Sequence, residues 1–323
     1  MALSRRNFLK GAAAGSAAAA CAAATTTPAD ARENQTLPPK AVGLLYDSTL
    51  CVGCKACVVA CRDANDTKPE FSTDEKIWDT ALDISGKTIT VIKMYSEGTG
   101  QHKDQEKDGF AFMKRSCLHC VDPSCVSVCP VSAMTKDPVT GIVSHEPADC
   151  IGCRYCIVAC PFAVPQFEFD KPFPKLLKCQ LCKQRLAVGK IPACAEVCPT
   201  GATLFGPVTA LKEEAARRTG TPAGQPTNYP RKVVDSTDVH ERPNAKYVQH
   251  TYGATEMGGT QMLLLSGVPF EKMGYPTLRE KSYAAEAETI QDGIYGGFVA
   301  PVALFAGLLY MAHKNTKNHD EEE

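Results

Sequence analysis

Sixteen of the seventeen cysteines in this chain fall into four groups of four, and this spacing limits what the chain can fold into. The first and third groups share the spacing Cys-x2-Cys-x2-Cys-x3-Cys. The second is Cys-x2-Cys-x4-Cys-x3-Cys and the fourth is Cys-x2-Cys-x11-Cys-x3-Cys. The groups are Cys51, Cys54, Cys57 and Cys61; Cys117, Cys120, Cys125 and Cys129; Cys150, Cys153, Cys156 and Cys160; and Cys179, Cys182, Cys194 and Cys198. This arithmetic favours metal ligation.

The spacing of the first and third groups is that of the bacterial ferredoxin run, which holds a 4Fe–4S cluster. Pro161 follows the third group, as in ferredoxins, whereas Arg62 follows the first. That departure removes a turn restraint but no ligand. The last cysteine of such a run ligates the other cluster of its pair. We therefore predict four 4Fe–4S clusters, with all sixteen cysteines as iron ligands.

Disulfides and zinc are the two rival explanations of the cysteines. Disulfide frameworks belong to exported proteins, but they spread their thiols, whereas Cys-x2-Cys-x2-Cys crowds three together. Structural zinc sites use Cys-x2-Cys pairs and have no need of a third and fourth cysteine at these spacings. Iron–sulfur ligation is therefore the preferred interpretation.

The groups also form an internal repeat. Groups one and three align without a gap, as Cys-Val-Gly-Cys-Lys-Ala-Cys-Val-Val-Ala-Cys and Cys-Ile-Gly-Cys-Arg-Tyr-Cys-Ile-Val-Ala-Cys, and groups two and four share Pro-x-Cys-x2-Val-Cys-Pro-x2-Ala. The predicted fold class is α+β, with duplicated two-cluster bacterial ferredoxin-like domains, inserts, and one C-terminal transmembrane helix. Linkers of 55, 20 and 18 residues separate successive groups. They favour residues 117–160 as one unit and 51–61 with 179–198 as the other, although the short third linker leaves a different pairing open.

The chain begins with a twin-arginine export pattern. Residues 4–10 read Ser-Arg-Arg-Asn-Phe-Leu-Lys, and an uncharged Ala-rich run follows that is too short to span a bilayer. We predict a signal peptide over residues 1–31, which includes the remaining cysteine, Cys21. The four-cluster body is then predicted over residues 32–265.

A second uncharged segment, residues 293–312, is long enough to cross a membrane as a helix. A buried helix of a soluble domain is the alternative. Acidic residues precede it, and His313, Lys314 and Lys317 follow it. The positive-inside rule then places the charged tail, residues 313–323, in the cytoplasm and the body outside. Residues 266–292 are predicted to be an extended connector.

Other segments give local predictions. Residues 208–218 after Pro207 suit a helix, 88–92 a strand, 137–141 a turn before a short strand, and 260–265 a strand. The Pro-rich stretch 221–231 is expected on the surface. His119, inside group two, is expected to be solvent-facing or hydrogen-bonded. Basic residues flank the groups and either offset cluster charge or lie at the surface; they are Lys55, Arg62, Lys114, Arg115, Arg154, Lys178, Lys183 and Arg185.

The net charge and the motifs missing from the sequence argue against several other functions. The net charge of −1 argues against a polybasic nucleic-acid binder. No dinucleotide fingerprint, phosphate-binding loop or nucleophile elbow occurs in the sequence. We therefore expect an electron-transfer subunit without a catalytic site of its own.

The chain resembles the iron–sulfur subunits of membrane-bound uptake NiFe hydrogenases of the hydrogenase-2 type. The resemblance is carried by the leader, the tail helix and six segments: residues 4–10, 45–51, 120–123, 152–156, 259–261 and 267–269. It implies an electron relay on the periplasmic side of the inner membrane. Electrons would pass from the hydrogenase small subunit to a polytopic, quinone-reactive membrane subunit. Formate dehydrogenase and polysulfide or sulfoxide reductase complexes use similar relays and remain the alternative.

The resemblance also implies how ligands are shared, with three from one group and one from its partner group. The implied sets are Cys51, Cys54, Cys57 with Cys198; Cys179, Cys182, Cys194 with Cys61; Cys117, Cys120, Cys125 with Cys160; and Cys150, Cys153, Cys156 with Cys129.

Overall fold

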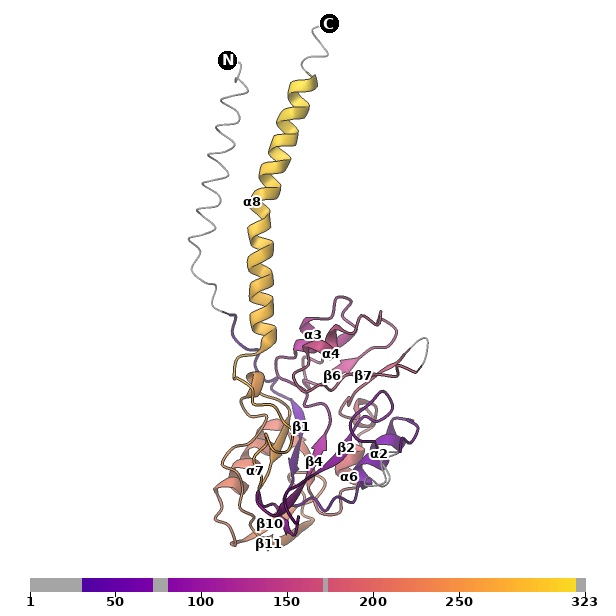
Figure 1. The fold of residues 1–323 in the computed structure, drawn as a ribbon, viewed down its shortest axis with the longest axis vertical. Coiled ribbons are helices and arrows are strands. Elements are labelled where there is room, and N and C mark those ends of the chain that lie inside the picture. Colours follow the sequence, from indigo (N-terminus) through magenta and orange to yellow (C-terminus); the bar gives the residue numbers. More distant parts are fainter. Residues whose placement is uncertain (1–30, 72–80, 171–173, 318–323) are drawn as a thin grey trace. The chain divides into compact units, whose positions relative to one another are not determined.

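The computed structural model describes residues 31–71, 81–170 and 174–317 (Figure 1). The predicted signal peptide and Cys21 lie outside these residues, apart from Ala31. The described chain divides into two compact units. One is the main unit, residues 34–284. The other, the helix unit, contains residues 31–33 and the chain from residue 285 onward.

A three-stranded sheet forms the centre of the main unit. Its order is β12 (Met262–Leu265), β1 (Val42–Asp47) and β9 (Thr203–Pro207), with β1 parallel to β12 and antiparallel to β9. Side chains alternate between the two faces of a strand. Leu44 therefore packs in the largest apolar cluster and Leu45 in a second one. Because both faces of the sheet are covered, β12 (Met-Leu-Leu-Leu) is a continuous apolar run rather than an alternating one.

The insert between groups one and two forms a second sheet in the order β2 (Val91–Ser96), β4 (Gly109–Arg115) and β3 (His102–Lys103). A strand over residues 88–92 was expected, and the observed one begins three residues later. The hydroxyl of Ser85 accepts hydrogen bonds from the backbone N–H of Lys87 and of Thr88. These bonds hold residues 85–88 in a turn, so pairing starts only at Val91.

Short elements surround the cysteine groups. They comprise the helices α2 (Ala56–Ala64), α3 (Ser124–Ser127), α4 (Tyr155–Ala159), α5 (Lys183–Leu186) and α6 (Ala193–Glu196), the hairpin of β5 (Met134–Lys136) with β6 (Val143–His145), and the hairpin of β7 (Gln166–Phe167) with β8 (Leu176–Leu177). The mixture of short helices and hairpins is the predicted α+β class.

The segment after group four matches its prediction in part. Helix α7 (Val208–Gly220) starts directly after Pro207, as expected. The Pro-rich stretch is not a surface wrap throughout, because β10 (Pro226–Pro230) pairs with β11 (Val239–Pro243) and buries Tyr229. The Tyr229 hydroxyl donates to Asn244 at 2.6 Å, which satisfies its polar end in the interior. A single turn of 3-10 helix, Glu256–Gly258, precedes β12.

The prediction of an extended connector over residues 266–292 was wrong. Val268, Phe270, Met273 and Tyr275 are buried in the largest apolar cluster, so residues 266–282 belong to the main unit. Helix α8 (Tyr283–Lys317) then begins ten residues before the predicted span. Its opening residues, Tyr-Ala-Ala-Glu-Ala-Glu, are mostly strong helix formers with acidic side chains near the N-terminus, which favours helix over extended chain.

Helix α8 is long and apolar enough to cross a membrane. The candidate span is Tyr283–His313, with a mean hydropathy of 1.8 in its most apolar window and none of that window buried. Phe298, Phe305 and Leu309 are among its exposed side chains. A core helix of a soluble domain would bury such residues, so lipid is the better account of what covers them.

Candidate iron–sulfur centres

Four cavities in the main unit are each lined by four cysteines. Site A contains Cys51, Cys54, Cys57 and Cys198; site B contains Cys61, Cys179, Cys182 and Cys194; site C contains Cys117, Cys120, Cys125 and Cys160; and site D contains Cys129, Cys150, Cys153 and Cys156. The structure thus brings together the same four sets that the family resemblance implied. The cavities, counted with the open solvent at their mouths, measure about 330, 390, 310 and 310 Å³ in that order.

Sites A and B are linked by two short helices. Cys57 and Cys61 lie one turn apart on α2, and one lines site A while the other lines site B. Cys194 on α6 lines site B, and Cys198, just beyond its end, lines site A. Helix α2 packs against α6. Because one turn of helix rises only about 5.4 Å, each helix holds two neighbouring centres close together.

Sites C and D repeat this arrangement. Cys125 on α3 lines site C, and Cys129, four residues later, lines site D. Cys156 on α4 lines site D, and Cys160 at its C-terminal end lines site C. Helix α3 packs against α4. The two pairs of sites therefore share one geometry, in which the cysteines of two short helices cross over between the centres.

Left-handed backbone lets the loops curve around the sites. Gly53 and Gly152 both have φ of +70°, and Lys55 and Arg154, which precede α2 and α4, have φ of +58° and +67°. Such residues turn the chain sharply and aim amide groups inward. The Gly53 N–H donates to the sulfur of Cys51 at 3.4 Å. In site B the Leu181 N–H donates to Cys179 at the same distance.

Shared helices link site A to site B and site C to site D, and Lys178, next to Cys179 of site B, approaches the sulfur of Cys117 in site C to 4.0 Å. The electrostatic effects of the thiols on one another agree with this order. Burial raises the pKa of Cys57 in site A to about 12, and Cys194 of site B raises it as well. Burial raises the pKa of Cys179 in site B to about 12, and Cys117 of site C adds to it. Burial and Cys117 raise the pKa of Cys125 in site C, with a contribution from Cys156 of site D. The sequence of neighbours is therefore A, B, C, D.

The donor chemistry fits a multi-iron cluster better than the rival centres. None of the sixteen cysteines in the described chain forms a disulfide. Tetrahedral zinc at Zn–S of 2.3 Å needs sulfurs about 3.8 Å apart. In the part of the chain that the structure describes, no group of three or more His, Cys, Asp or Glu side chains converges closely enough to hold one metal ion. Four thiols around one cavity are the ligand set of a 4Fe–4S cluster.

Two buried lysines lie at the interior sites. Lys114 on β4 lines site B and is 1% exposed, and Lys178 lines site C and is 3% exposed. The Lys178 ammonium donates to the carbonyl oxygens of Val143 and Cys179 and approaches the sulfur of Cys117 to 4.0 Å. The sequence singled out both residues but could not separate them from surface lysines such as Lys183, which is exposed.

Two histidines adjoin the same region. His119 is fully buried rather than solvent-facing, and its Nδ1 accepts a hydrogen bond from the Val143 N–H at 3.1 Å. Burial, with Lys178 nearby, lowers its pKa well below the ordinary value, so the ring is neutral. His145 lines site D, but the sequence analysis did not identify it. Its short distance from group three in the sequence is the one signal that could have pointed to it.

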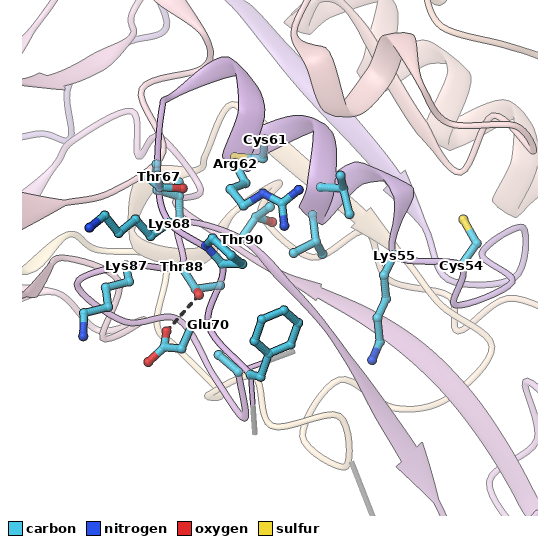
Figure 2. A pocket seen from close by; sticks show the side chains of 16 residues that line it. Cys54, Lys55, Cys61, Arg62, Thr67, Lys68, Glu70, Lys87, Thr88 and Thr90 are labelled. Carbon is cyan, nitrogen blue, oxygen red and sulfur yellow. Dashed lines mark hydrogen bonds between the residues drawn. The ribbon is translucent and has the colours of Figure 1, made fainter. Parts of the chain in front are cut away.

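A fifth cavity lies outside the thiol sets. It encloses about 610 Å³ beside α2, and Cys54 of site A and Cys61 of site B both reach its wall (Figure 2). Lys55, Arg62 and Lys87 also line it. Glu70 accepts a hydrogen bond from Thr88 across its floor at 2.9 Å. The cavity gathers no set of ligands and forms the solvent side of sites A and B.

Comparisons with known proteins bear on the cofactor and on the family. A family model described as a 4Fe-4S dicluster domain matches residues 109–208, which span groups two to four. The hydrogenase-2 operon protein HybA of Escherichia coli O157:H7 is 45% identical over 325 aligned residues, with 98% of each chain covered. The chain belongs to the HybA family. The predicted resemblance is therefore confirmed over nearly the whole length.

More distant similarity extends beyond HybA. A protein of Nitratidesulfovibrio vulgaris is 34% identical over 91% of this chain and 72% of its own length. The formate dehydrogenase-O iron-sulfur subunit of Escherichia coli K12 is 37% identical over 59% of this chain and 61% of its own. HybA thus matches end to end, whereas the formate dehydrogenase subunit shares only part of the chain.

Proposed function

We propose that this chain is an electron relay that holds one 4Fe–4S cluster in each of sites A to D. The four cavities with four thiols each, coupled in the order A, B, C, D, are the single observation that carries the proposal. A cluster of this kind accepts and returns one electron at a potential set by its surroundings. In this proposal the chain carries electrons only, and the catalytic site belongs to another subunit of the complex.

The protein's own residues perform three tasks in this relay. The cysteines hold the centres. The short helices α2, α6, α3 and α4 place cysteines of two neighbouring centres about one helical turn apart, which keeps the centres close together. Backbone N–H groups such as that of Gly53 donate to the sulfurs and stabilise negative charge there. The apolar core around sites B and C excludes water from the interior of the path.

Electrons enter and leave at the two end sites, where a ligand reaches the surface. Cys54 of site A and Cys153 of site D are the two exposed thiols among the sixteen. Ser282, the last residue before α8, donates to Asp122 at 2.6 Å, and Asp122 lies between two site C cysteines in the sequence. We assign sites C and D to the membrane end of the path and site A to the redox partner.

The partners follow from the family. Electrons from the small subunit of a NiFe hydrogenase, whose large subunit oxidises hydrogen, pass through the chain to a polytopic membrane subunit that reduces quinone. A twin-arginine leader, export to the periplasmic side, and anchorage by α8 with the tail in the cytoplasm complete the proposal. The shared geometry of the A–B and C–D pairs supports duplication of a two-cluster ferredoxin-like unit, with residues 51–61 and 179–198 forming one copy and 117–160 the other.

A formate dehydrogenase complex is the second candidate, favoured by the similarity to the formate dehydrogenase-O subunit over 59% of the chain. The relay would be the same and only the enzyme that feeds it would differ. The end-to-end match to HybA, including the C-terminal helix, makes hydrogenase the first choice.

The test is anaerobic purification of the tagged full chain from its native membrane in mild detergent. Four clusters predict about 16 iron atoms per chain (4 × 4), together with nickel and hydrogen-dependent viologen reduction in the same fraction. Full iron with molybdenum in place of nickel would retain the relay and change its partner. A colourless chain with little iron would overturn the proposal.

A further inference from the structure

Lys114 is a lysine whose side chain is buried at site B. It is 1% exposed, and its ammonium has no hydrogen-bond partner among the described residues. Its own carbonyl accepts a hydrogen bond from the Tyr275 hydroxyl at 2.6 Å, which fixes the backbone of β4 at this point. A buried cation without a partner costs several kcal/mol. Something anionic has to compensate it.

Among the described residues, the thiols of two sites are the groups that favour the charge on Lys114 most strongly. Lys114 lines site B together with Cys61, Cys179, Cys182 and Cys194, and no other side chain on that lining is charged. Cys194 of site B and Cys57 of site A are the thiols that act most strongly on the Lys114 ammonium. Since Cys57 belongs to site A, the ammonium lies within the field of both centres.

We propose that Lys114 is a positioning residue for charge, which stabilises the reduced state of the centre in site B and so raises its reduction potential. The inference rests on the proposed function, because it requires an anionic cluster in that site. The reduced cluster carries one more negative charge than the oxidised one, so a fixed cation favours it. One electron arrives from a neighbouring centre and leaves to the next, and Lys114 keeps its proton throughout.

The location of the charge decides how strongly it acts. A buried charge acts strongly on a neighbouring centre because the protein interior has a low effective dielectric constant. An exposed charge at the same distance is screened by water and salt. Lys183 follows Cys182 directly in the sequence but is exposed, so it offers a matched control next to the same centre.

The test is a redox titration, followed by electron paramagnetic resonance, of the full-length holoprotein in detergent. Lys114→Met removes the charge at similar volume, Lys114→Arg retains it, and Lys183→Met removes the exposed charge. We expect Lys114→Met to weaken electron uptake by one centre at least tenfold, about 59 mV for each factor of ten. Lys183→Met should change it by less than threefold and Lys114→Arg should stay near wild type. The paramagnetic resonance signal whose midpoint potential shifts in Lys114→Met should be the one that is lost in Cys182→Ser.

Iron content separates the outcomes. Full iron in Lys114→Met with an unchanged titration would overturn the role of Lys114 while leaving the relay intact. Loss of iron in Lys114→Met but not in Lys114→Arg supports the need for a cation at this position. Equal loss of iron in both variants would show that the side chain only fills space, and would overturn the inference. A wild-type chain without iron or signal would instead be a failure of the proposed function.

Discussion

At the scale of single residues, the sites are defined by cysteines that the sequence identifies and by neighbours that it does not. The four thiol sets were implied by family resemblance and each lines one cavity. The burial of Lys114 was beyond prediction, because Met113 and Lys114 are both buried and break the alternation of β4. The charges that compensate Lys114 come from cysteines at positions 57 and 194, which only the folded chain brings near it.

One residue-scale prediction concerns Cys153, the exposed thiol of site D. Cys153→Ser should lose the cluster of site D, because a hydroxyl is a much poorer ligand for iron than a thiolate. Hydrogen-dependent quinone reduction should then fall to background while dye-linked hydrogen oxidation by the catalytic subunits persists. Iron content, expected to drop by about four per chain, checks the assignment. Loss of dye-linked activity as well would contradict a pure relay.

A second prediction compares two glycines that share one backbone conformation. Gly53 and Gly152 both have φ of +70°, so alanine at either is strained by about 1–2 kcal/mol. A Cβ on Gly53 would also meet the Phe112 ring at 2.4 Å, whereas one on Gly152 meets nothing within 4 Å. Gly53→Ala should therefore lower the melting temperature and the iron occupancy more than Gly152→Ala. Equal effects would show that the ring moves aside freely.

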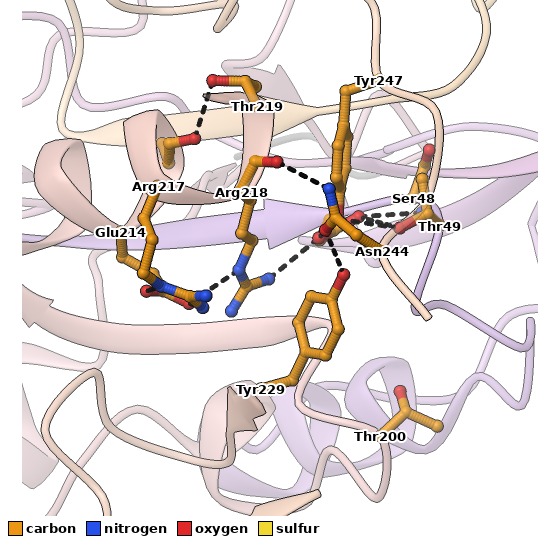
Figure 3. Close-up of polar contacts among 12 residues, drawn as sticks. Ser48, Thr49, Thr200, Glu214, Arg217, Arg218, Thr219, Tyr229, Asn244 and Tyr247 are labelled. Carbon is orange, nitrogen blue, oxygen red and sulfur yellow. Dashed lines mark hydrogen bonds and ion pairs between the residues drawn. The ribbon is translucent and has the colours of Figure 1, made fainter. Parts of the chain in front are cut away.

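At the scale of elements, a buried ion network joins α7 to the central sheet (Figure 3). Arg218 is fully buried, and it donates to Asp47 on β1 at 2.8 Å and to Glu214 one turn back at 2.7 Å. The Tyr247 hydroxyl donates to the same Asp47 carboxylate at 2.7 Å. The sequence predicted α7 from its start after Pro207, but an Arg near the end of a helix is usually exposed, so its burial was not predictable.

Breaking this network should destabilise the fold strongly. Arg218→Leu leaves the Asp47 carboxylate buried without its cation, which costs about 3–5 kcal/mol. Arg217 is the matched control, since it pairs with the same Glu214 but is 41% exposed. Arg217→Leu should cost less than about 1 kcal/mol. Denaturant titration of the two holoproteins measures the difference, and similar losses would show that the buried pair adds nothing.

The same network predicts an acid sensitivity. Burial raises the pKa of Glu214, but its two arginine partners outweigh this and the net pKa lies below the ordinary 4.5. A lowered pKa in the folded state means stability that is present above about pH 4.5 and lost as the pH falls through the folded value. Glu214→Gln should therefore flatten the decline of stability on the acid side. An unchanged acid profile would place the titrating group elsewhere.

At the scale of the whole molecule, the sequence predicted the types of segment more reliably than the residues at which they begin and end. The apolar run marked a candidate span, but α8 starts ten residues earlier because charged residues can continue a helix beyond an apolar stretch. Residues 266–282 read as a linker for lack of periodicity, yet Val268 and Phe270 fill the core beside strands distant in the sequence. Burial by non-local partners leaves no local pattern to read.

The division into a main unit and a helix unit predicts that anchorage and cluster binding are separable. A chain stopped after Asp292 keeps every cysteine of sites A to D and loses most of the candidate span Tyr283–His313. It should bind about 16 iron atoms and be released from membranes by alkaline washing, with loss of hydrogen-dependent quinone reduction. Pro301→Ala, which retains the span, should stay in the membrane. If the shortened chain resisted the wash like the full one, protein partners rather than α8 would hold the relay at the bilayer.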